Sequence, residues 1–323
     1  MSTVTAGAGA APGAGPGAST GRAPAPAPRG RGRRRWWGGQ PLGTLFAAPY
    51  LVFVLVVFAY PLGFSAYMAF HDYFFTAPGV DVPKPFVGFD NFATVLTDPQ
   101  VLASFRNTAV FLVINVPLTV GLALVLASAL NAGVRWAAAY RVAYYVPYLT
   151  ASVSLVGVWM LLFSSNGLVN AVLGPLAPDP SWLANKALAM PTIALYVTWK
   201  QLGFYVLLYL AALQNVPREL YESAETDGAG GVQRFLNVTV PGVRAATTLV
   251  LVLAIITGTN LFTEPYLLTG GGGPDGASVT PVLLIYQRGI QQQNPDVAAA
   301  IGMVLVIVVG LLSLAAQRLN RER

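Results

Sequence analysis

The chain has 323 residues, of which 55% are hydrophobic and only 10% are charged, and its mean hydropathy is +0.59. Soluble domains carry about 25% charged residues, so this composition excludes an ordinary soluble domain and indicates a membrane protein. The chain contains no cysteine, which excludes disulfides, zinc–thiolate sites and iron–sulfur clusters. Its single histidine, His71, has no second histidine or cysteine with which to bind a metal, so we expect neither a metal site nor a cofactor.

Residues 1–40 form a tail rich in Ala, Gly, Pro and Arg, with too few apolar residues to bury a core. We expect this tail to be disordered and cytoplasmic. Five arginines between Arg29 and Arg35, followed by Trp36 and Trp37, are typical of a cytoplasmic anchor in front of a membrane span. A cleaved signal peptide is the alternative, but the apolar run that follows is too long and lacks a clear small-x-small site.

Six apolar runs are each long enough to cross the hydrocarbon core of a bilayer, which is about 30 Å thick. They lie near residues 43–70, 105–130, 140–163, 189–213, 242–264 and 297–316. The runs predict an all-α membrane protein with six transmembrane helices in one membrane domain over residues 41–317, followed by a short cytoplasmic tail at 318–323.

The distribution of basic residues predicts which side of the membrane each loop occupies. With the N-terminus inside, the cytoplasmic segments hold 14 of the 19 basic residues: Arg22, Arg29, Arg31, Arg33, Arg34, Arg35, Arg135, Arg141, Arg218, Arg234, Arg244, Arg318, Arg321 and Arg323. The positive-inside rule then places both termini and the loop 214–241 in the cytoplasm. The same distribution accounts for the formal charge of +6 without a nucleic-acid partner.

The cytoplasmic loop 214–241 carries mixed charge within a chain that is otherwise nearly uncharged. Pro217 suits a first helical position, and Glu219 and Glu222 suit the positive end of a helix. The pair Asp227-Gly228 is a turn signal, because Gly228 is free to adopt positive φ.

A second short amphipathic stretch follows this turn. Val232, Phe235 and Leu236 give it an apolar side, and Pro241 closes it. The loop as a whole therefore predicts a helix, a turn and a second helix that lie at the membrane surface.

The spacing within this loop resembles the EAA motif in the membrane subunits of bacterial ABC importers. That motif runs Glu-Ala-Ala, three residues, Gly, nine residues and Ile-x-Leu-Pro. In this chain Glu222-Ser223-Ala224 is followed at both spacings by Gly228 and then by Val238-Thr239-Val240-Pro241. The departures are Ser223 for Ala, Val238 for Ile and Val240 for Leu, all of them small.

The resemblance implies that this loop is the coupling helix, which presses into a groove on an ATPase subunit. An ordinary amphipathic surface hairpin is the alternative. The residues that the resemblance assigns to ATPase coupling are Glu219, Glu222, Ser223, Ala224, Asp227, Gly228 and Pro241.

Three further motifs are similar to the carbohydrate-uptake branch of these permeases, over roughly residues 40–320. They are a "GxxNF…NT" pattern at the start of the second span, a "W…GLxN" end to the third and an "LTxGGP" turn after the fifth. In this chain they correspond to Gly88–Phe92 with Asn107-Thr108, to Trp159 with Gly167–Asn170, and to Leu268–Pro274. The turn and the extended N-terminus look more like the first of two paired permeases.

This resemblance implies a permease subunit of a binding-protein-dependent ABC importer for a sugar or sugar-like solute. It implies four kinds of partner: a second permease subunit, two ATP-binding cassette subunits, an extracytoplasmic solute-binding protein and the membrane lipid. The expected location is the bacterial cytoplasmic membrane. The subunit forms half of an alternating-access path.

The chain offers no catalytic set of its own. None of the three lysines, Lys84, Lys186 and Lys200, follows a glycine, so a P-loop for ATP is absent. The run Gly270–Gly273 lacks a lysine and is expected to be a flexible turn outside the membrane. We therefore expect a transport subunit and not an enzyme, with ATP hydrolysis in a partner.

A few polar residues in the spans are candidates for the solute path. An unpaired lysine near the middle of a span costs about 2.5–3.5 kcal/mol, so Lys200 must face protein or water. Asn260 and Glu264 are four residues apart, which predicts one helical face. A polar cavity lined by these three residues, with Trp199 and Tyr205 as stacking surfaces for sugar rings, is one interpretation. Packing, interfacial anchoring and subunit contact are the other.

Other classes of membrane protein fit less well. A secondary transporter or channel tends to have more spans, inverted repeats or intramembrane acids for ion coupling. A membrane-embedded enzyme would need a paired catalytic set. A permease of the same ABC class for a solute other than a sugar stays open, as does the question of which permease subunit carries the solute site.

Overall fold

The computed structural model describes residues 41–321 except 78 and 81, and the named secondary-structure elements within that part are all helices. The predicted disordered tail at 1–40 lies outside the described residues. The chain divides into two units, residues 1–53 and residues 54–323. The described part of the first unit is a single apolar helical stretch, which α1 (Pro41–Val54) occupies.

Four helices are long and apolar enough to cross a membrane by themselves. They are the run Leu45–Ala69, α4 (Pro99–Asn131), α8 (Ala189–Leu213) and α15 (Pro295–Arg321), which is apolar up to Arg318. The first run consists of the end of α1, a π-turn η1 (Leu55–Ala59) and α2 (Tyr60–Ala69). Two bent helix pairs bring the number of candidate spans in the described residues to as many as six.

The run predicted as one span at 140–163 is broken into two helices. These are α5 (Ala137–Leu149) and α6 (Ser152–Leu162), which are bent by 98° with respect to each other. Thr150 and Ala151 between them have extended backbone, with ψ of 141° and 128°. Hydropathy does not register two extended residues within an apolar run, so the sequence predicted a single helix.

The run predicted at 242–264 is also interrupted. Helix α12 (Arg244–Thr259) ends at Asn260, and a separate short helix α13 (Thr263–Leu268) follows. At its N-terminal end, α12 is bent by 72° from the preceding helical run Gly231–Gly242. Asn260 and Glu264 therefore belong to different elements, and the prediction that they share one helical face is wrong.

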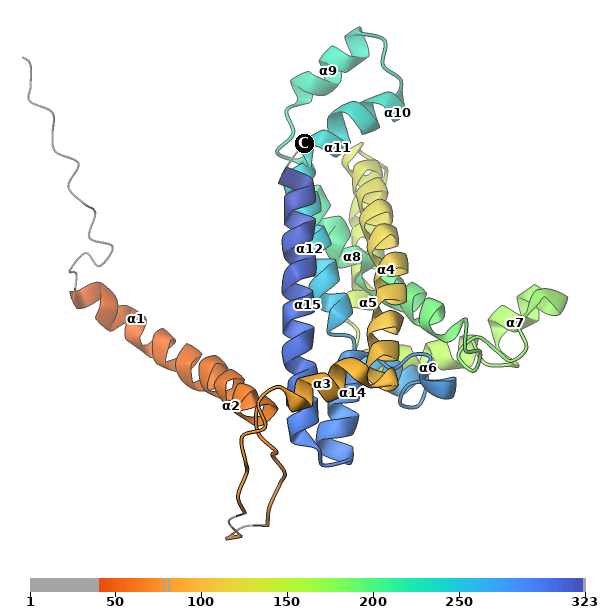
Figure 1. The fold of residues 1–323 in the computed structure, drawn as a ribbon. Coiled ribbons are helices and arrows are strands. Elements are labelled where there is room, and N and C mark those ends of the chain that lie inside the picture. The colour runs from red at the N-terminus through yellow and green to blue at the C-terminus, as the bar shows by residue number, and fades with distance from the viewer. Residues whose placement is uncertain (1–40, 78, 81, 322–323) are drawn as a thin grey trace, which may run out of the picture. The chain divides into compact units, whose positions relative to one another are not determined.

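Shorter elements connect these helices. They are α3 (Asp90–Thr97), α7 (Leu168–Leu173), η2 (Gly174–Leu176), α9 (Arg218–Thr226), α10 (Gly231–Arg234), η3 (Phe235–Thr239), α11 (Val240–Gly242), η4 (Pro274–Gly276), α14 (Pro281–Tyr286) and η5 (Gln287–Gln291). Figure 1 shows α9 and α10 beyond the end of α4, with α6 and α7 toward the other end of that helix.

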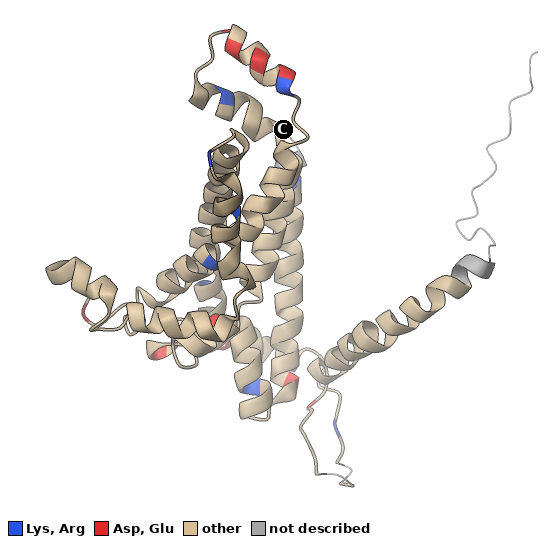
Figure 2. Ribbon diagram, turned by 180° about the vertical axis from the view of Figure 1, so that it is seen from behind, with Lys and Arg blue, Asp and Glu red and all other residues tan. Residues whose placement is uncertain are grey.

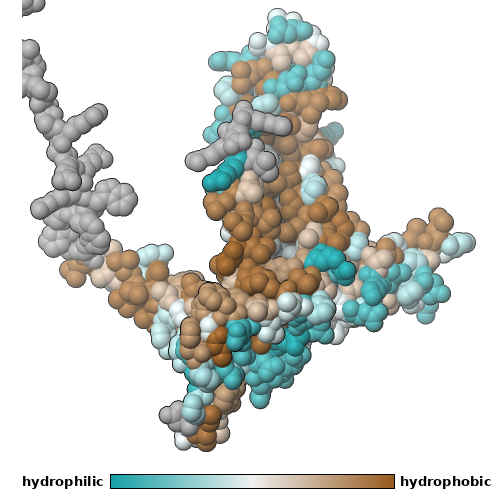
Figure 3. All heavy atoms as spheres, in the orientation of Figure 1, coloured by the Kyte–Doolittle hydropathy of each residue, from teal (hydrophilic) through white to brown (hydrophobic). Residues whose placement is uncertain are grey.

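The core of the second unit forms where α4, α8 and α12 pack together. Small and aromatic side chains meet there, such as Ala123 and Ala127 on α4 against Tyr205 and Tyr209 on α8. The sides of the bundle are apolar and the hydrophilic residues gather toward its ends (Figure 3). This distribution is what a lipid environment requires, because apolar side chains that face lipid need no burial in protein.

A glycine allows α5 to approach α8 closely. A Cβ at Gly203 would overlap the carbonyl oxygen of Tyr144 and would lie 2.8 Å from the Cα of Tyr145. These obstructing atoms belong to the backbone of a neighbouring helix, so they cannot move aside by a change of side-chain rotamer. Small residues at such crossings let membrane helices pack backbone against backbone.

We predict that Gly203→Val lowers the stability of the purified protein, because the added atoms force α5 away from α8. Overpacking typically costs about 1–3 kcal/mol, and a backbone obstacle puts this site at the upper end. Thermal unfolding in detergent measures the effect. Gly121→Ala is the control, since a Cβ at Gly121 on α4 meets nothing within 4 Å. Equal melting temperatures for Gly203→Val and the parent would contradict the contact.

Candidate functional site

The loop 214–241 folds as two short helices joined by a turn, as the sequence predicts. Helix α9 begins at Arg218, one residue after Pro217, and ends at Thr226 with Asp227 as its C-cap. Gly228 has a φ of +79°, and the next amide, that of Ala229, donates to the carbonyl of Ala224 over 2.9 Å. The left-handed conformation at Gly228 therefore ends α9 and reverses the chain, which is the role of a C-terminal glycine.

The second half of the loop is a continuous helical run from Gly231 to Gly242. It contains a π-turn, η3, and ends one residue after Pro241. Phe235, Val238 and Val240 are partly buried against the core cluster around α4 and α8. This half of the loop is thus attached to the membrane bundle.

Two polar contacts join α9 to this attached half. The hydroxyls of Tyr221 and Thr239 lie 3.0 Å apart, and Thr239 is buried. Arg234 Nη1 lies 3.1 Å from Glu225 Oε2, in a pair that is largely open to solvent. Exposed pairs of this kind contribute little stability, so the Tyr221–Thr239 contact is the firmer of the two.

The loop exposes both acidic and apolar side chains to solvent. Figure 2 shows the acidic residues of α9, which are Glu219, Glu222 and Glu225. Val232 is 74% exposed and Leu236 is 56% exposed on the other half. These exposed apolar side chains lie beside charged ones on a loop outside the bundle.

A pocket of about 720 Å³ lies between this loop and the ends of α4 and α8. Its polar lining comes from Ser128, Asn131, Gln214, Arg218, Tyr221, Glu222, Arg234 and Thr239. The loop therefore stands over a hollow instead of packing flat on the bundle, and this leaves α9 room to shift relative to it.

Within the membrane part, Lys200 is paired. Its Nζ lies 3.3 Å from Oε1 of Glu264 and donates a hydrogen bond to Oγ of Ser152, and both carboxylate and ammonium side chains are only 12% exposed. The ammonium is also 6.0 Å from the ring centroid of Tyr196. A buried lysine in a span needs such partners, since insertion without them is costly.

The pair could have been found in the sequence. Glu264 is the one acidic residue within the six predicted spans, so it is the natural counter-ion for Lys200. The contact of Ser152 with Lys200 is not predictable in this way, because a serine in an apolar run can have several different structural roles. Its role became visible only when the fold placed it beside α8.

The other candidate path residues differ in their exposure to solvent. Asn260 is exposed, and its side-chain amide donates to the carbonyl of Ile256 over 2.8 Å. Tyr205 is 2% exposed and packs in the core, so the expectation that it offers a stacking surface is wrong for this conformation. Trp199 is 40% exposed, with Trp159 5.6 Å away between ring centroids, and keeps a free ring surface.

Comparison with known proteins identifies the family. A family model described as "Binding-protein-dependent transport system inner membrane component" matches residues 119–323, more than half of the chain. The arabinooligosaccharides transport system permease protein AraP of Bacillus subtilis is 33% identical over 283 residues, which are 85% of this chain and 87% of AraP. The chain belongs to this family of ABC importer permeases.

A second relative and a solved structure agree with this assignment. The diacetylchitobiose uptake system permease protein NgcF of Streptomyces coelicolor is 31% identical over 85% of this chain and 79% of NgcF. The crystal structure of a bacterial alginate ABC transporter with an alginate pentasaccharide-bound periplasmic protein contains a chain of the same fold. It is 24% identical, with a TM-score of 0.73 over 89% of this chain and 98% of that one. The protein is thus a multi-pass membrane transport component and not an enzyme.

The asparagines of the permease motifs hold loops in place. Asn107 donates through Nδ2 to the carbonyls of Gly276 and Val279, at 2.9 and 3.0 Å, and so ties α4 to the segment after α13. Asn91 donates to the carbonyls of Ala69 and His71 at the end of α2, both at 3.0 Å. Asparagine suits this work because one amide group can satisfy two orphan carbonyls.

The glycine run of the permease is held more firmly than a flexible turn would be. All four residues of Gly270–Gly273 have positive φ. The carbonyl of Gly271 accepts from Nε2 of Gln287 at 2.9 Å, and the carbonyl of Gly272 accepts from the amide of Ser278 at 2.8 Å. The glycines are needed for their backbone conformation, and the turn they make is fixed by hydrogen bonds.

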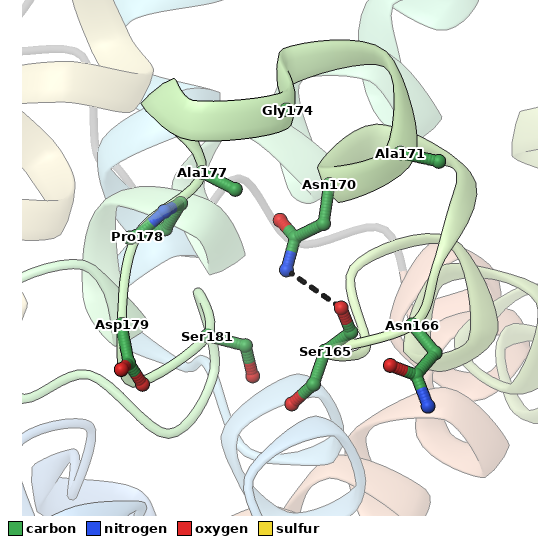
Figure 4. Close-up of a pocket in the computed structure, with 9 residues that line it drawn as sticks. All are labelled: Ser165, Asn166, Asn170, Ala171, Gly174, Ala177, Pro178, Asp179 and Ser181. Carbon is green, nitrogen blue, oxygen red and sulfur yellow. Dashed lines mark hydrogen bonds between the residues drawn. The ribbon is translucent and has the colours of Figure 1, made fainter.

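A second pocket, of about 520 Å³, lies beside α7 (Figure 4). Asn170 points into it and donates to the carbonyl of Ser165 at 3.2 Å, while its Oδ1 accepts from Nε1 of Trp182 at 2.7 Å. Ser181 adds a hydroxyl to the lining. The motif asparagine of this region therefore shapes a polar hollow and holds the loop that follows α7.

We predict that Gly228→Val loosens the loop 214–241, because a β-branched side chain is strained at a φ of +79°. The cost is about 1 kcal/mol or more, so hydrogen exchange in residues 218–234 should quicken about fivefold. Gly231→Ala is the matched control, since Gly231 lies in a helix and a Cβ there meets nothing within 4 Å. Unchanged exchange in Gly228→Val would show that the turn does not set the loop geometry.

Proposed function

We propose that this permease imports a short oligosaccharide or related sugar, delivered from outside by a solute-binding protein. The observation that carries the proposal is the near full-length similarity to permeases named for arabinooligosaccharides and for diacetylchitobiose. Both solutes are short, uncharged, hydroxylated chains. The permease would pair with a second permease subunit to form an alternating-access path, and two ATP-binding cassette subunits would drive it.

The loop 214–241 is the proposed contact with an ATPase subunit. Its second half is anchored in the bundle through Phe235 and Val238, so a push on α9 reaches the membrane helices through the contact of Tyr221 with Thr239. Glu222 is exposed and available to a basic or amide group of a partner. Glu219, Ser223, Ala224 and Asp227 lie on the same short helix or its cap, and Gly228 and Pro241 fix its geometry.

The proposed solute path passes α8, the end of α12 at Asn260 and the start of α13. Lys200 and Glu264 neutralise each other there, so the wall carries no net charge from this pair, which suits an uncharged solute. Trp199 and the exposed amide of Asn260 supply the stacking and hydrogen-bonding groups that a sugar ring requires.

Uptake by whole cells tests the function. Cells that carry the gene should accumulate labelled pentose or hexosamine oligosaccharides of two to four units, and cells without the gene should not. Uptake should stop when ATP is depleted and persist when the proton gradient alone is collapsed. Uptake that follows the proton gradient, or accumulation of none of the sugars in the panel, would contradict the proposal.

We predict the membrane orientation from the charge distribution. Reporters fused near Arg135, Gly230 and Arg318 should show a cytoplasmic location, since these positions lie in the basic segments. Fusions near Asp179 and Gly272 should show an external location. A cytoplasmic signal at Gly272 would contradict the six-span arrangement.

We predict that Glu222→Lys leaves the protein in the membrane but weakens its contact with the ATPase. A charged hydrogen bond in a desolvated groove is worth roughly 1.5–3 kcal/mol, so binding should weaken by about one to two orders of magnitude. Copurification of the ATPase and solute-stimulated ATP hydrolysis both measure this. Gly228→Asp should act in the same direction through the turn.

The control for both variants is Ala229→Ser, a small change on the neighbouring residue. It should retain parental copurification and transport. If Glu222→Lys and Gly228→Asp also retained a full complement of ATPase and parental transport, the loop would not be the coupling element.

A further inference from the structure

Two helices of the second unit start directly after a break in a membrane run. Helix α6 starts at Ser152, after the extended residues Thr150 and Ala151, and α13 starts at Thr263, after the break that follows Asn260. Segments of two or three non-helical residues between packed helices are where a hinge can form. Both breaks lie in the part of the fold that is far from the coupling loop along α8.

The first turns of both helices meet the same side chain. Ser152 is the first residue of α6 and accepts a hydrogen bond from Lys200, while Glu264 is the second residue of α13 and pairs with Lys200 at 3.3 Å. The carbonyl of Ser152 also accepts from the hydroxyl of Tyr196, one turn away on α8, at 3.5 Å. Helix α8 therefore holds the start of both helices through one ammonium group.

The helices that precede the two breaks are held to α8 differently. Helix α5 is attached by the backbone approach at Gly203, and α12 by the hydrogen bond from Tyr209 to Thr247 at 3.2 Å. Helix α4 is attached by a buried hydrogen bond from Asn115 to Thr198 at 2.8 Å. These contacts involve no charge, and they make α4, α5, α8 and α12 a frame from which α6 and α13 project.

Beyond the breaks, α6 and α13 pack on each other and on the outer half of α8. Val156 and Trp159 of α6 share an apolar cluster with Leu268 of α13, with Tyr196 of α8 and with Phe111 of α4. The two helices can therefore move together as one layer, which is attached to the frame by this apolar cluster and by the charged contacts of Lys200.

We propose that Lys200 is a positioning residue of the transport cycle: it holds the first turns of α6 and α13 on α8 in this conformation and releases both together when the path opens. This inference rests on the alternating access of the proposed function. It does not depend on which solute is carried.

A charged contact suits this role for a physical reason. In a low-dielectric wall the ammonium and the carboxylate cannot separate unless water reaches both of them. Separation of α6 and α13 from α8 is thereby tied to the entry of water into the path. An apolar contact at the same place would permit α6 and α13 to separate partly from α8. The ion pair instead favours two arrangements: both helices held on α8 without water, or both helices released with water in the path.

The test uses the absence of cysteine from the chain. Single cysteines at Leu155 on α6 and Leu267 on α13, both partly buried in the cluster around α8, report the position of each helix. A third cysteine at Leu253 on α12 reports the frame. The importer is reconstituted whole in proteoliposomes, and the labelling rate of this chain by a small polar maleimide is followed.

In Lys200→Met we expect the nucleotide-free importer to label at both Leu155→Cys and Leu267→Cys at least about tenfold faster, since detached helices expose their packed faces. The rate at Leu253→Cys should stay at the parental value. The maximal rate of uptake should fall while the solute concentration for half-maximal uptake stays unchanged. Lys186→Met is the matched control, because Lys186 and its partner Asp275 are exposed.

The charge exchange Lys200→Glu with Glu264→Lys should return slow labelling at both reporters, because the pair is restored in reverse. Unchanged labelling in Lys200→Met, or faster labelling at only one of the two helices, would overturn the proposal. So would a rise in the half-maximal solute concentration at unchanged maximal rate, which would make Lys200 a solute contact. If Lys200→Met does not assemble with its partners, the charge-exchange variant alone decides. Fast labelling at Leu155→Cys and Leu267→Cys in an assembled charge-exchange variant would also overturn the proposal.

Failure of this inference is distinguishable from failure of the proposed function. The parental importer is assayed beside every variant, and its own uptake decides whether the solute is a sugar. The labelling rates need only nucleotide-free protein, so they decide the role of Lys200 whatever the solute proves to be.

Discussion

Backbone groups freed by a helix break inside a membrane must find partners within the protein, because lipid supplies none. This constraint organises the outer half of the permease. At the break after α12, the carbonyl of Leu261 accepts from the buried hydroxyl of Thr280 at 2.6 Å, and the amide of Asn260 bonds back to Ile256. At the break after α5, the carbonyl of Val146 accepts from the hydroxyl of Thr150 at 2.8 Å, and the carbonyl of Ser152 accepts from the hydroxyl of Tyr196 at 3.5 Å. Polar side chains thus bond to backbone carbonyls at both breaks.

The loop 214–241 lies outside the apolar bundle and is under no such constraint, and its structure differs accordingly. Water can satisfy the ends of α9 and the turn at Gly228, so the loop needs only a few fixed contacts. The hydrogen bond between Tyr221 and Thr239 and the packing of Phe235 provide them. The remaining surface of α9 is left exposed and charged, which suits a segment whose partner is another protein. One chain thus combines a rigid attachment with an open contact surface.

The motif residues that mark the family mostly act on the fold. Asn107 and Asn91 hold loops to the ends of α4 and α2, and the glycines at 270–273 provide backbone conformations that other residues adopt at a cost. The residues proposed for transport itself, Lys200 and Glu264, lie outside these motifs. A family resemblance based on the motifs therefore identifies the scaffold more directly than it identifies the solute.

The sequence by itself predicted the six apolar runs, the helix–turn–helix loop with its turn at Gly228 and the requirement that Lys200 face protein or water. Each of these depends on local quantities: the length of an apolar run, the φ angle that glycine allows, and the cost of a charge in lipid. Only the tertiary structure decided the 98° bend between α5 and α6, the end of α12 at Asn260, the burial of Tyr205 and the presence of Ser152 beside Lys200. A break in a membrane helix is stable only where residues distant in the sequence form hydrogen bonds with the freed backbone groups. Hydropathy along the chain does not indicate which residues will be those neighbours.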